Sequence, residues 1–99
     1  MNYMMQMNNF WTKRRISRIN SSAADLYYAL LSVSNSIGWN TKVSVSNAML
    51  TAMTDMSHST FIRARNALVD AGYIRYYPAT GFKDSTYELI EFNYENLFK

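Results

Sequence analysis

One segment of the chain gathers side chains that can bind phosphates and the edges of bases. It covers residues 55–74 and reads DMSHSTFIRARNALVDAGYI, which predicts a helix with Ser57 at its start and Gly72 just past its end, followed by a strand. At a helical repeat of about 3.6 residues, one side of this helix is wholly polar. That side carries Ser59, Arg63, Asn66 and Asp70, with Thr60 next to it.

These residue types match the chemistry of a DNA duplex. Arginine binds guanine edges or phosphates, asparagine binds adenine, and hydroxyl groups donate to phosphate oxygens. The free N–H groups at a helix N-terminus form a phosphate site as well. We therefore expect contacts with DNA in the major groove from Ser59, Thr60, Arg63 and Asn66. An ordinary solvated helix face is the alternative that this helix, taken alone, leaves open.

The second arginine of the segment has a different place. Arg65 falls between apolar positions, where a leucine would normally lie, so we expect its stem to pack on the core. Its guanidinium then needs a partner, either helix-end carbonyls or a carboxylate, for which the candidates are Asp25, Asp55 and Asp70. We expect structural roles for Arg65 and for Gly72, which sits where a left-handed helix cap is required. His58, the one histidine, reads as part of the helix start and not as a catalytic base.

Two helices are expected before this segment. The stronger pattern is SAADLYYALLSVSNSI at residues 22–37, with Ser21 or Ser22 as its cap and Gly38 at its end. Its apolar positions recur at helical spacing at Leu26, Leu30, Val33 and Ile37. A shorter helix is expected over residues 9–18, and residues 1–9 before it are ordered only by a partner or by packing back on the domain.

Short strands complete the pattern. KVSVS at 42–46 reads as a strand, and NAMLTAM reads as a helix that Ser46 caps and that buries Met49, Leu50 and Met53. YIRYY (73–77) and TYELIEF (86–92) read as two strands joined by a loop. This order predicts an α+β fold, mainly α: a winged helix-turn-helix with a C-terminal β-hairpin wing and an extra N-terminal helix.

Basic residues gather near the start of the chain, and acids gather near its end. WTKRRISR predicts phosphate contacts by Lys13, Arg14, Arg15 and Arg18. An apolar dimerisation patch of Phe10, Trp11, Tyr3 and the early methionines is the alternative, and both can hold. Lys42 and Lys83 are further phosphate candidates. The hairpin loop, with Thr80, Phe82 and Lys83, fits the minor groove, a second subunit or a plain turn equally well.

Composition narrows the remaining classes. The chain has no cysteine, which excludes disulfides and thiolate metal sites, and it has no apolar run long enough to span a membrane. No paired carboxylates, metal-ligand cluster or nucleophile with a base stands out, so we expect no enzyme activity, no cofactor and no metal. The first charges follow the first apolar residues, so we expect no secretory signal and a cytoplasmic protein.

NNFW, the basic residues after it, and SAADLYYALLSVSNSIGW resemble phage replisome organisers and the N-terminal domain of DnaD-like primosomal proteins. VSVSNAMLTAMTDMSHSTFIRARNALVDAGYIRYY resembles the same proteins, including the Arg-Ala-Arg-Asn at residues 63–66. The resemblance covers residues 8–92. It implies a domain that binds double-stranded DNA at an origin and helps to bring a helicase loader and helicase to it.

The resemblance also implies an organisation. Residues 1–20 form a basic and aromatic extension, 21–92 the winged-helix domain, and 93–99 a tail or linker to a further domain for loader and helicase contacts. Two other functions stay open: an oligomerisation scaffold, which is the chief use of this domain in the DnaD branch, and a transcriptional regulator with the same fold. We expect a homodimer or larger homo-oligomer in a bacterial host's cytoplasm.

Overall fold

Four helices and three antiparallel strands make up residues 1–81 and 83–98, the part of the chain that the computed structural model describes. The fold is α+β and mainly helical, as predicted. In chain order the elements are α1 (Tyr3–Ile16), α2 (Ser21–Ser36), β1 (Lys42–Val45), α3 (Asn47–Thr54), α4 (His58–Asp70), β2 (Ile74–Tyr77) and β3 (Ser85–Leu89). None of the described helices has the length and apolar character needed to cross a membrane.

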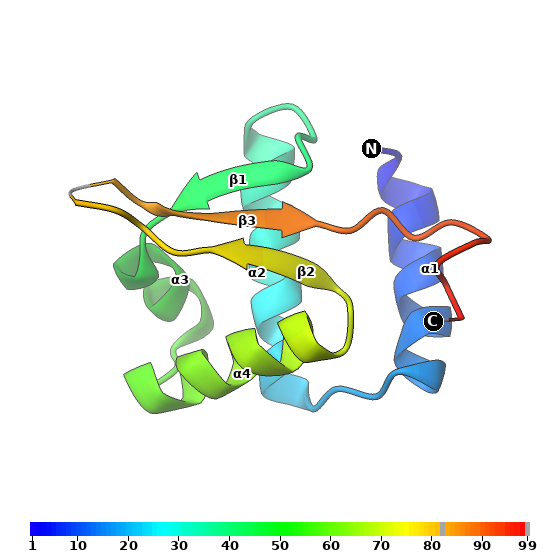
Figure 1. The fold of residues 1–99 in the computed structure, drawn as a ribbon, viewed down its shortest axis with the longest axis horizontal. Coiled ribbons are helices and arrows are strands. Elements are labelled where there is room, and N and C mark those ends of the chain that lie inside the picture. Colours follow the sequence, from blue (N-terminus) through cyan, green and yellow to red (C-terminus); the bar gives the residue numbers. More distant parts are fainter. Residues whose placement is uncertain (82, 99) are drawn as a thin grey trace.

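The strands form one sheet in the order β1-β3-β2. Val43 lies opposite Tyr87 and Ile74 opposite Leu89, and all four side chains are buried against the helices. The alternate side chains form the outer face of the sheet, which consists of Lys42, Ser44, Arg75, Tyr77, Thr86 and Glu88. The hairpin of β2 and β3 extends to one end of the molecule beside α3, whereas α1 stands at the other end (Figure 1).

Local cap chemistry sets most helix boundaries. Ser46 and Ser57 cap α3 and α4, since their hydroxyls accept hydrogen bonds from Met49 N (3.1 Å) and Thr60 N (3.3 Å). Gly72 has a φ of 81°, and Tyr73 N donates to Leu68 O across it (2.9 Å), which closes the predicted left-handed cap. These three predictions are confirmed.

The cap of α2 was predicted one or two residues too late. The side chain of Asn20, and not of Ser21 or Ser22, accepts the hydrogen bond from Ala23 N (2.9 Å). Asparagine is as good a cap as serine, so the run Asn-Ser-Ser did not decide the position. The helix also ends before Ile37, which is half-exposed and not part of the core.

The first helix is longer than predicted. α1 begins at Tyr3, and Asn2 caps it by accepting from Met5 N (3.1 Å). Residues 3–8 lack an apolar repeat, and their order comes from packing on the end of the chain. Asn9 Nδ2 donates to Phe92 O (2.8 Å), and the N-terminal ammonium lies 3.7 Å from Glu91 Oε1. The second of the two expected alternatives, packing back on the domain, therefore holds.

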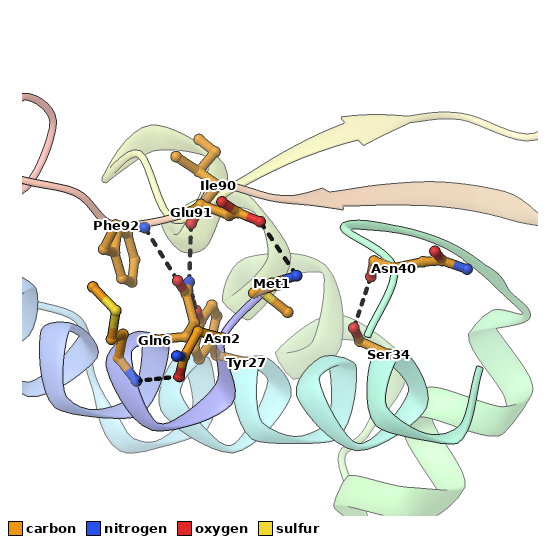
Figure 2. Close-up of polar contacts among 10 residues, drawn as sticks. Met1, Asn2, Gln6, Tyr27, Ser34, Asn40, Ile90, Glu91 and Phe92 are labelled. Carbon is orange, nitrogen blue, oxygen red and sulfur yellow. Dashed lines mark hydrogen bonds and ion pairs between the residues drawn. The ribbon is translucent and has the colours of Figure 1, made fainter. Parts of the chain in front are cut away.

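A buried amide fixes this packing. Gln6 is almost fully buried, and its Nε2 donates to the Tyr27 hydroxyl (2.7 Å) and to Ile90 O (2.9 Å). Its Oε1 accepts from Phe92 N (3.1 Å). Figure 2 shows Gln6 between α2 and the strand-like segment after β3. One side chain thus joins the first helix, the central helix and the last part of the chain.

Aromatic rings surround this amide. The Phe10 ring stacks on that of Tyr27 with centroids 4.8 Å apart, and both meet the edge of Tyr73. Phe92 closes the cluster against Tyr27 and Tyr73. Leu97, in the segment predicted to be a tail, is buried in the same core. Residues 3–16 and 92–97 therefore share one core with the central helices.

Two predicted core methionines are exposed. In α3 only Leu50 is buried, whereas Met49 and Met53 are about half-exposed. This helix is short and contacts the domain mainly through α2, so a single position per turn faces inward. The prediction that Met49 and Met53 are buried was wrong.

Replacing Gln6 by leucine should lower the free energy of unfolding by about 3 kcal/mol. The variant leaves the Tyr27 hydroxyl, Ile90 O and Phe92 N without their partner, and each unsatisfied buried group costs about 1–3 kcal/mol. Urea denaturation followed by circular dichroism measures the loss. Asn8→Leu, on the exposed side of the same helix, is the control and should leave the midpoint unchanged. Equal midpoints for both variants would contradict a structural role for this amide.

The buried tyrosines should make the fold sensitive to alkali. Burial raises the pKa of Tyr73 to about 12 and also raises the pKa of Tyr27, above the value of about 10 for an unfolded tyrosine. The unfolded chain then loses these protons first, so stability is complete below about pH 10 and falls as the pH rises toward about 12.

Unfolding midpoints measured between neutral and alkaline pH test this expectation. Tyr73→Phe should show a shallower decline, although it also loses the hydrogen bond to Ser17 O (2.5 Å). Tyr94→Phe, at an exposed ring, is the control. Declines with the same slope in wild type and Tyr73→Phe would rule out the buried phenol as their cause.

Candidate nucleic-acid interface

The polar side of α4 faces solvent, as its spacing predicted. Ser59, Arg63, Asn66 and Asp70 are all exposed, and Thr60 is half-buried beside them. We call these five residues the polar face of α4. Core residues Phe61, Ala64 and Leu68 cover the opposite side of the helix. α4 thus carries a continuous row of hydrogen-bonding groups that no other described element covers.

The N-terminal turn of α4 is organised around one hydroxyl. Ser57 Oγ accepts from Thr60 N and lies 3.0 Å from Thr60 Oγ1. Arg63 Nη2 in turn donates weakly to Thr60 Oγ1 (3.4 Å). This chain of contacts holds Arg63 toward the start of the helix without pairing it to a carboxylate among the described residues. Its guanidinium therefore remains available to an anion or a base edge.

Arg65 has the structural position predicted for it, but its partner is different. The guanidinium carbon lies 4.0 Å from the centre of the Tyr76 ring and 5.5 Å from that of Phe61. No carboxylate of the described residues forms an ion pair with it, so the candidates Asp25, Asp55 and Asp70 were wrong. Spacing along one helix could not reveal a ring on β2. The contact joins α4 to the hairpin.

The hairpin is closed at its base by a buried hydroxyl. Ser85 Oγ accepts from Ala79 N (3.2 Å) and lies 3.3 Å from the Tyr76 hydroxyl. Thr80 and Lys83 in the loop are exposed. Phe82, which we also expected at the tip, lies outside the described residues. Lys83 is thus an exposed cation in the loop of the hairpin.

Lys13 does not belong to a phosphate-binding surface. Its side chain is only 2 % exposed, and its ammonium lies 5.9 Å from the centre of the Tyr73 ring. Burial lowers the pKa of this lysine. The predicted phosphate contact is therefore corrected. The same helix turn that exposes Arg15 points Lys13 inward, which the charge run alone did not distinguish.

The other arginines of this run lie far from the hairpin. Arg15 and Arg18 are exposed and Arg14 is half-buried. Arg14 and Arg15 lie in the last turn of α1, and Arg18 lies just beyond its end. α1 occupies the end of the molecule opposite the hairpin tip (Figure 1). The cations predicted to contact DNA thus form two separate groups, one at α4 and the hairpin and one at the end of α1. Phe10, predicted for an apolar patch here, is fully buried instead.

Lys42 faces a local acid. It lies directly opposite Glu88 on the outer face of the sheet, and Arg75 Nη1 lies 3.4 Å from the Glu88 carboxylate. The hydrogen bond from the Tyr77 hydroxyl (2.9 Å), with the nearby cations, holds the pKa of Glu88 below its usual value. Lys42 therefore lies beside an acid that also pairs with Arg75, and it is the weakest of the predicted DNA contacts.

Trp11 and Tyr3 were predicted as part of an apolar patch, but the two hollows beside them were not predicted. Trp11 lines one hollow with Arg14, Arg15 and Arg18, and Tyr3 packs on Trp39 beside a second hollow at α2. Trp39 has a φ of 61°, which is rare for a bulky residue, in the turn that ends α2. A tryptophan directly before the basic run in WTKRRISR was the signal for the first hollow.

No protein-family model matches this chain, and no curated protein matches it either.

The Arg65–Tyr76 contact should contribute measurable coupling between α4 and the hairpin. A double-mutant cycle of Arg65→Met and Tyr76→Leu should give about 0.5–2 kcal/mol, because a partly desolvated guanidinium gains energy over an aromatic face. Urea unfolding of the four proteins measures it. The same cycle with Tyr77→Leu, on the outer face of β2, should be additive within about 0.5 kcal/mol. Equal coupling in both cycles would contradict a specific contact.

Proposed function

We propose that this domain is a winged helix that binds double-stranded DNA, with α4 in the major groove. The observation that carries the proposal is the polar face of α4, exposed on a helix that follows α3 across a short turn and precedes a β-hairpin. A helix in this position of a helix-turn-helix typically enters the major groove. Arg63 and Asn66 have the groups that read guanine and adenine there, and Ser59 and Thr60 suit phosphates.

The hairpin extends this surface. The hairpin tip and the start of α4 both lie toward the left of Figure 1, with α3 between them. The exposed Lys83 of the hairpin loop would bind the phosphates beside the groove. The Arg65–Tyr76 contact keeps the hairpin and α4 in one arrangement. A fixed spacing between helix and wing favours binding, because the protein then loses less conformational entropy when it associates with DNA.

We further propose that the chain is related to phage replisome organisers and the DnaD-like primosomal proteins. The support is the sequence resemblance of residues 8–92 together with the helix order. In that setting the duplex is an origin region, the domain works in a bacterial cytoplasm, and a helicase loader is reached through another domain. The alternative is a transcriptional regulator that uses the same contacts. Binding assays with origin DNA and with promoter DNA distinguish the two functions.

The number of cations on the duplex is measurable. If Lys83 is the one side chain that neutralises a phosphate, a log–log plot of affinity against salt should have a slope of about −1. If Arg14, Arg15 and Arg18 lie on the same duplex, four phosphates are neutralised and the slope should approach about −3.6. Fluorescence anisotropy of a labelled duplex over a salt series gives this number directly.

Arg63→Ala should weaken binding to the preferred duplex by about 1–3 kcal/mol and relax preference at one base pair. The preferred site is first obtained by selection from a randomised duplex pool with the wild-type chain. Anisotropy titrations with that site then compare the variants.

The matched control is Arg75→Ala. This arginine is exposed as well, but it lies on the outer face of the sheet and pairs with Glu88. It removes the same charge from the chain, so its effect on affinity should be small. Wild-type affinity of Arg63→Ala for the selected site would refute the groove assignment.

An oligomerisation scaffold is the second candidate, and exposed apolar side chains favour it. Tyr3, Met4, Met5 and Trp11 all expose at least two fifths of their surface along α1. Large exposed apolar side chains on one element are typical of a contact between proteins. A chain that forms dimers or larger assemblies in solution and does not bind duplex DNA at low salt would support this function.

A further inference from the structure

A hollow at the C-terminal end of α1 combines positive charge with an aromatic ring. Its lining is Trp11, Arg14, Arg15, Arg18 and Ile19, and its volume is about 300 Å³. We call it the basic pocket. It is built by the last turns of α1 and the connection to α2, at the end of the molecule opposite the hairpin tip (Figure 1). It is therefore distinct from the polar face of α4.

The indole of Trp11 contacts two side chains of its own helix and stays half-exposed. Its ring meets the buried Phe10 ring edge-on, with centroids 5.5 Å apart and planes at 80°. Arg14 lies over it, with the guanidinium carbon 5.5 Å from the ring centre. Even so, Trp11 remains 52 % exposed. An anchored and half-exposed aromatic face is a surface on which a flat ligand can stack.

The charges around this ring are those of three arginines. Among the described residues, no carboxylate forms an ion pair with Arg14, Arg15 or Arg18. Basic residues in the last turn of a helix also stabilise its C-terminal carbonyls, which explains some of this charge. That effect does not explain Arg18, which lies beyond the end of the helix, and it does not explain Trp11.

A single strand of DNA has the chemistry that fits both properties. Its phosphates bind arginines, and its unpaired bases expose faces that stack on tryptophan. In a duplex those base faces are covered by neighbouring pairs, so Trp11 adds nothing to duplex binding. An acidic peptide would satisfy the arginines but would leave the indole without a partner.

We propose that the basic pocket binds single-stranded DNA by stacking a base on Trp11 and binding the flanking phosphates with Arg14, Arg15 and Arg18. The site goes beyond the proposed duplex function and does not depend on it, because the two use different elements. Sequence preference at this site is weak, since every base has a face to stack.

The test uses the fluorescence of Trp11 in a Trp39→Phe background, where it is the one tryptophan. The probe is an oligo-dT of about 12 nucleotides, within the usual site size of single-strand binders. We expect quenching on binding, and a loss of affinity of about 10-fold or more for Trp11→Leu measured by anisotropy of labelled probe. An abasic chain of the same length, which has the phosphates but no bases, should bind correspondingly more weakly.

A second variant guards against a folding defect at Trp11. The double variant Arg15→Gln with Arg18→Gln changes two exposed residues. It should weaken binding, and the log–log slope of affinity against salt should become less steep by the amount expected for about two phosphate contacts. The matched control is Lys42→Gln with Arg75→Gln, which removes the same charge from the outer face of the sheet and should have little effect. Tyr94→Leu is the control for loss of an exposed ring.

Three results would overturn the proposal. These are equal affinity for the oligo-dT and the abasic chain, equal losses in the two double variants, and wild-type affinity of folded Trp11→Leu. A change of solution mass in Trp11→Leu with unchanged oligo-dT binding would identify the surface as a contact between copies instead. If the wild-type chain binds oligo-dT but does not bind duplex DNA, the proposed duplex function is wrong and the proposal for this site stands.

Discussion

The buried amide of Gln6 is the interaction on which the arrangement of this domain depends. Both of its N–H groups and its oxygen are used, on Tyr27, Ile90 and Phe92. An amide in the interior is stabilising only when its partners are all in place, and it is costly otherwise. The amide therefore selects one position of α1 against α2 and the segment after β3. An apolar residue could fill the same space without fixing that register.

The position of α1 in turn decides what the charged surfaces are. Because Gln6 and Phe10 fix one side of the helix in the core, Trp11 and Arg15 must face out, and Lys13 must face in. At the other end of the molecule, Arg65 on Tyr76 does for α4 and the hairpin what Gln6 does for α1. Both devices are polar or charged groups placed inside, and each orients an exposed surface on the opposite side of its own element.

Sequence reasoning succeeded where structure is decided within a few residues. The caps at Ser46 and Ser57 and the left-handed turn at Gly72 depend on local chemistry, and so does the exposure of Arg63 and Asn66 on one side of α4. It failed where the deciding group is distant in the chain. No residue near Gln6 in the sequence indicates that its partners lie at Ile90 and Phe92. The predicted helix therefore began at residue 9, and what orders residues 1–9 was left open between a partner and the domain itself. The same holds for Arg65 and the Tyr76 ring, and for the burial of Lys13.

Lys13 shows how one basic run can serve two purposes. Its ammonium lies 3.7 Å from the position that a Cβ of Gly72 would occupy, at the C-terminal end of α4. A helix C-terminus carries partial negative charge, so a cation there is favourable even when it is largely desolvated. Gly72 adopts the φ of 81° that the turn there requires. One lysine of the run therefore fastens α1 to α4, and its arginine neighbours, on the outside of the same helix, stay available to a ligand.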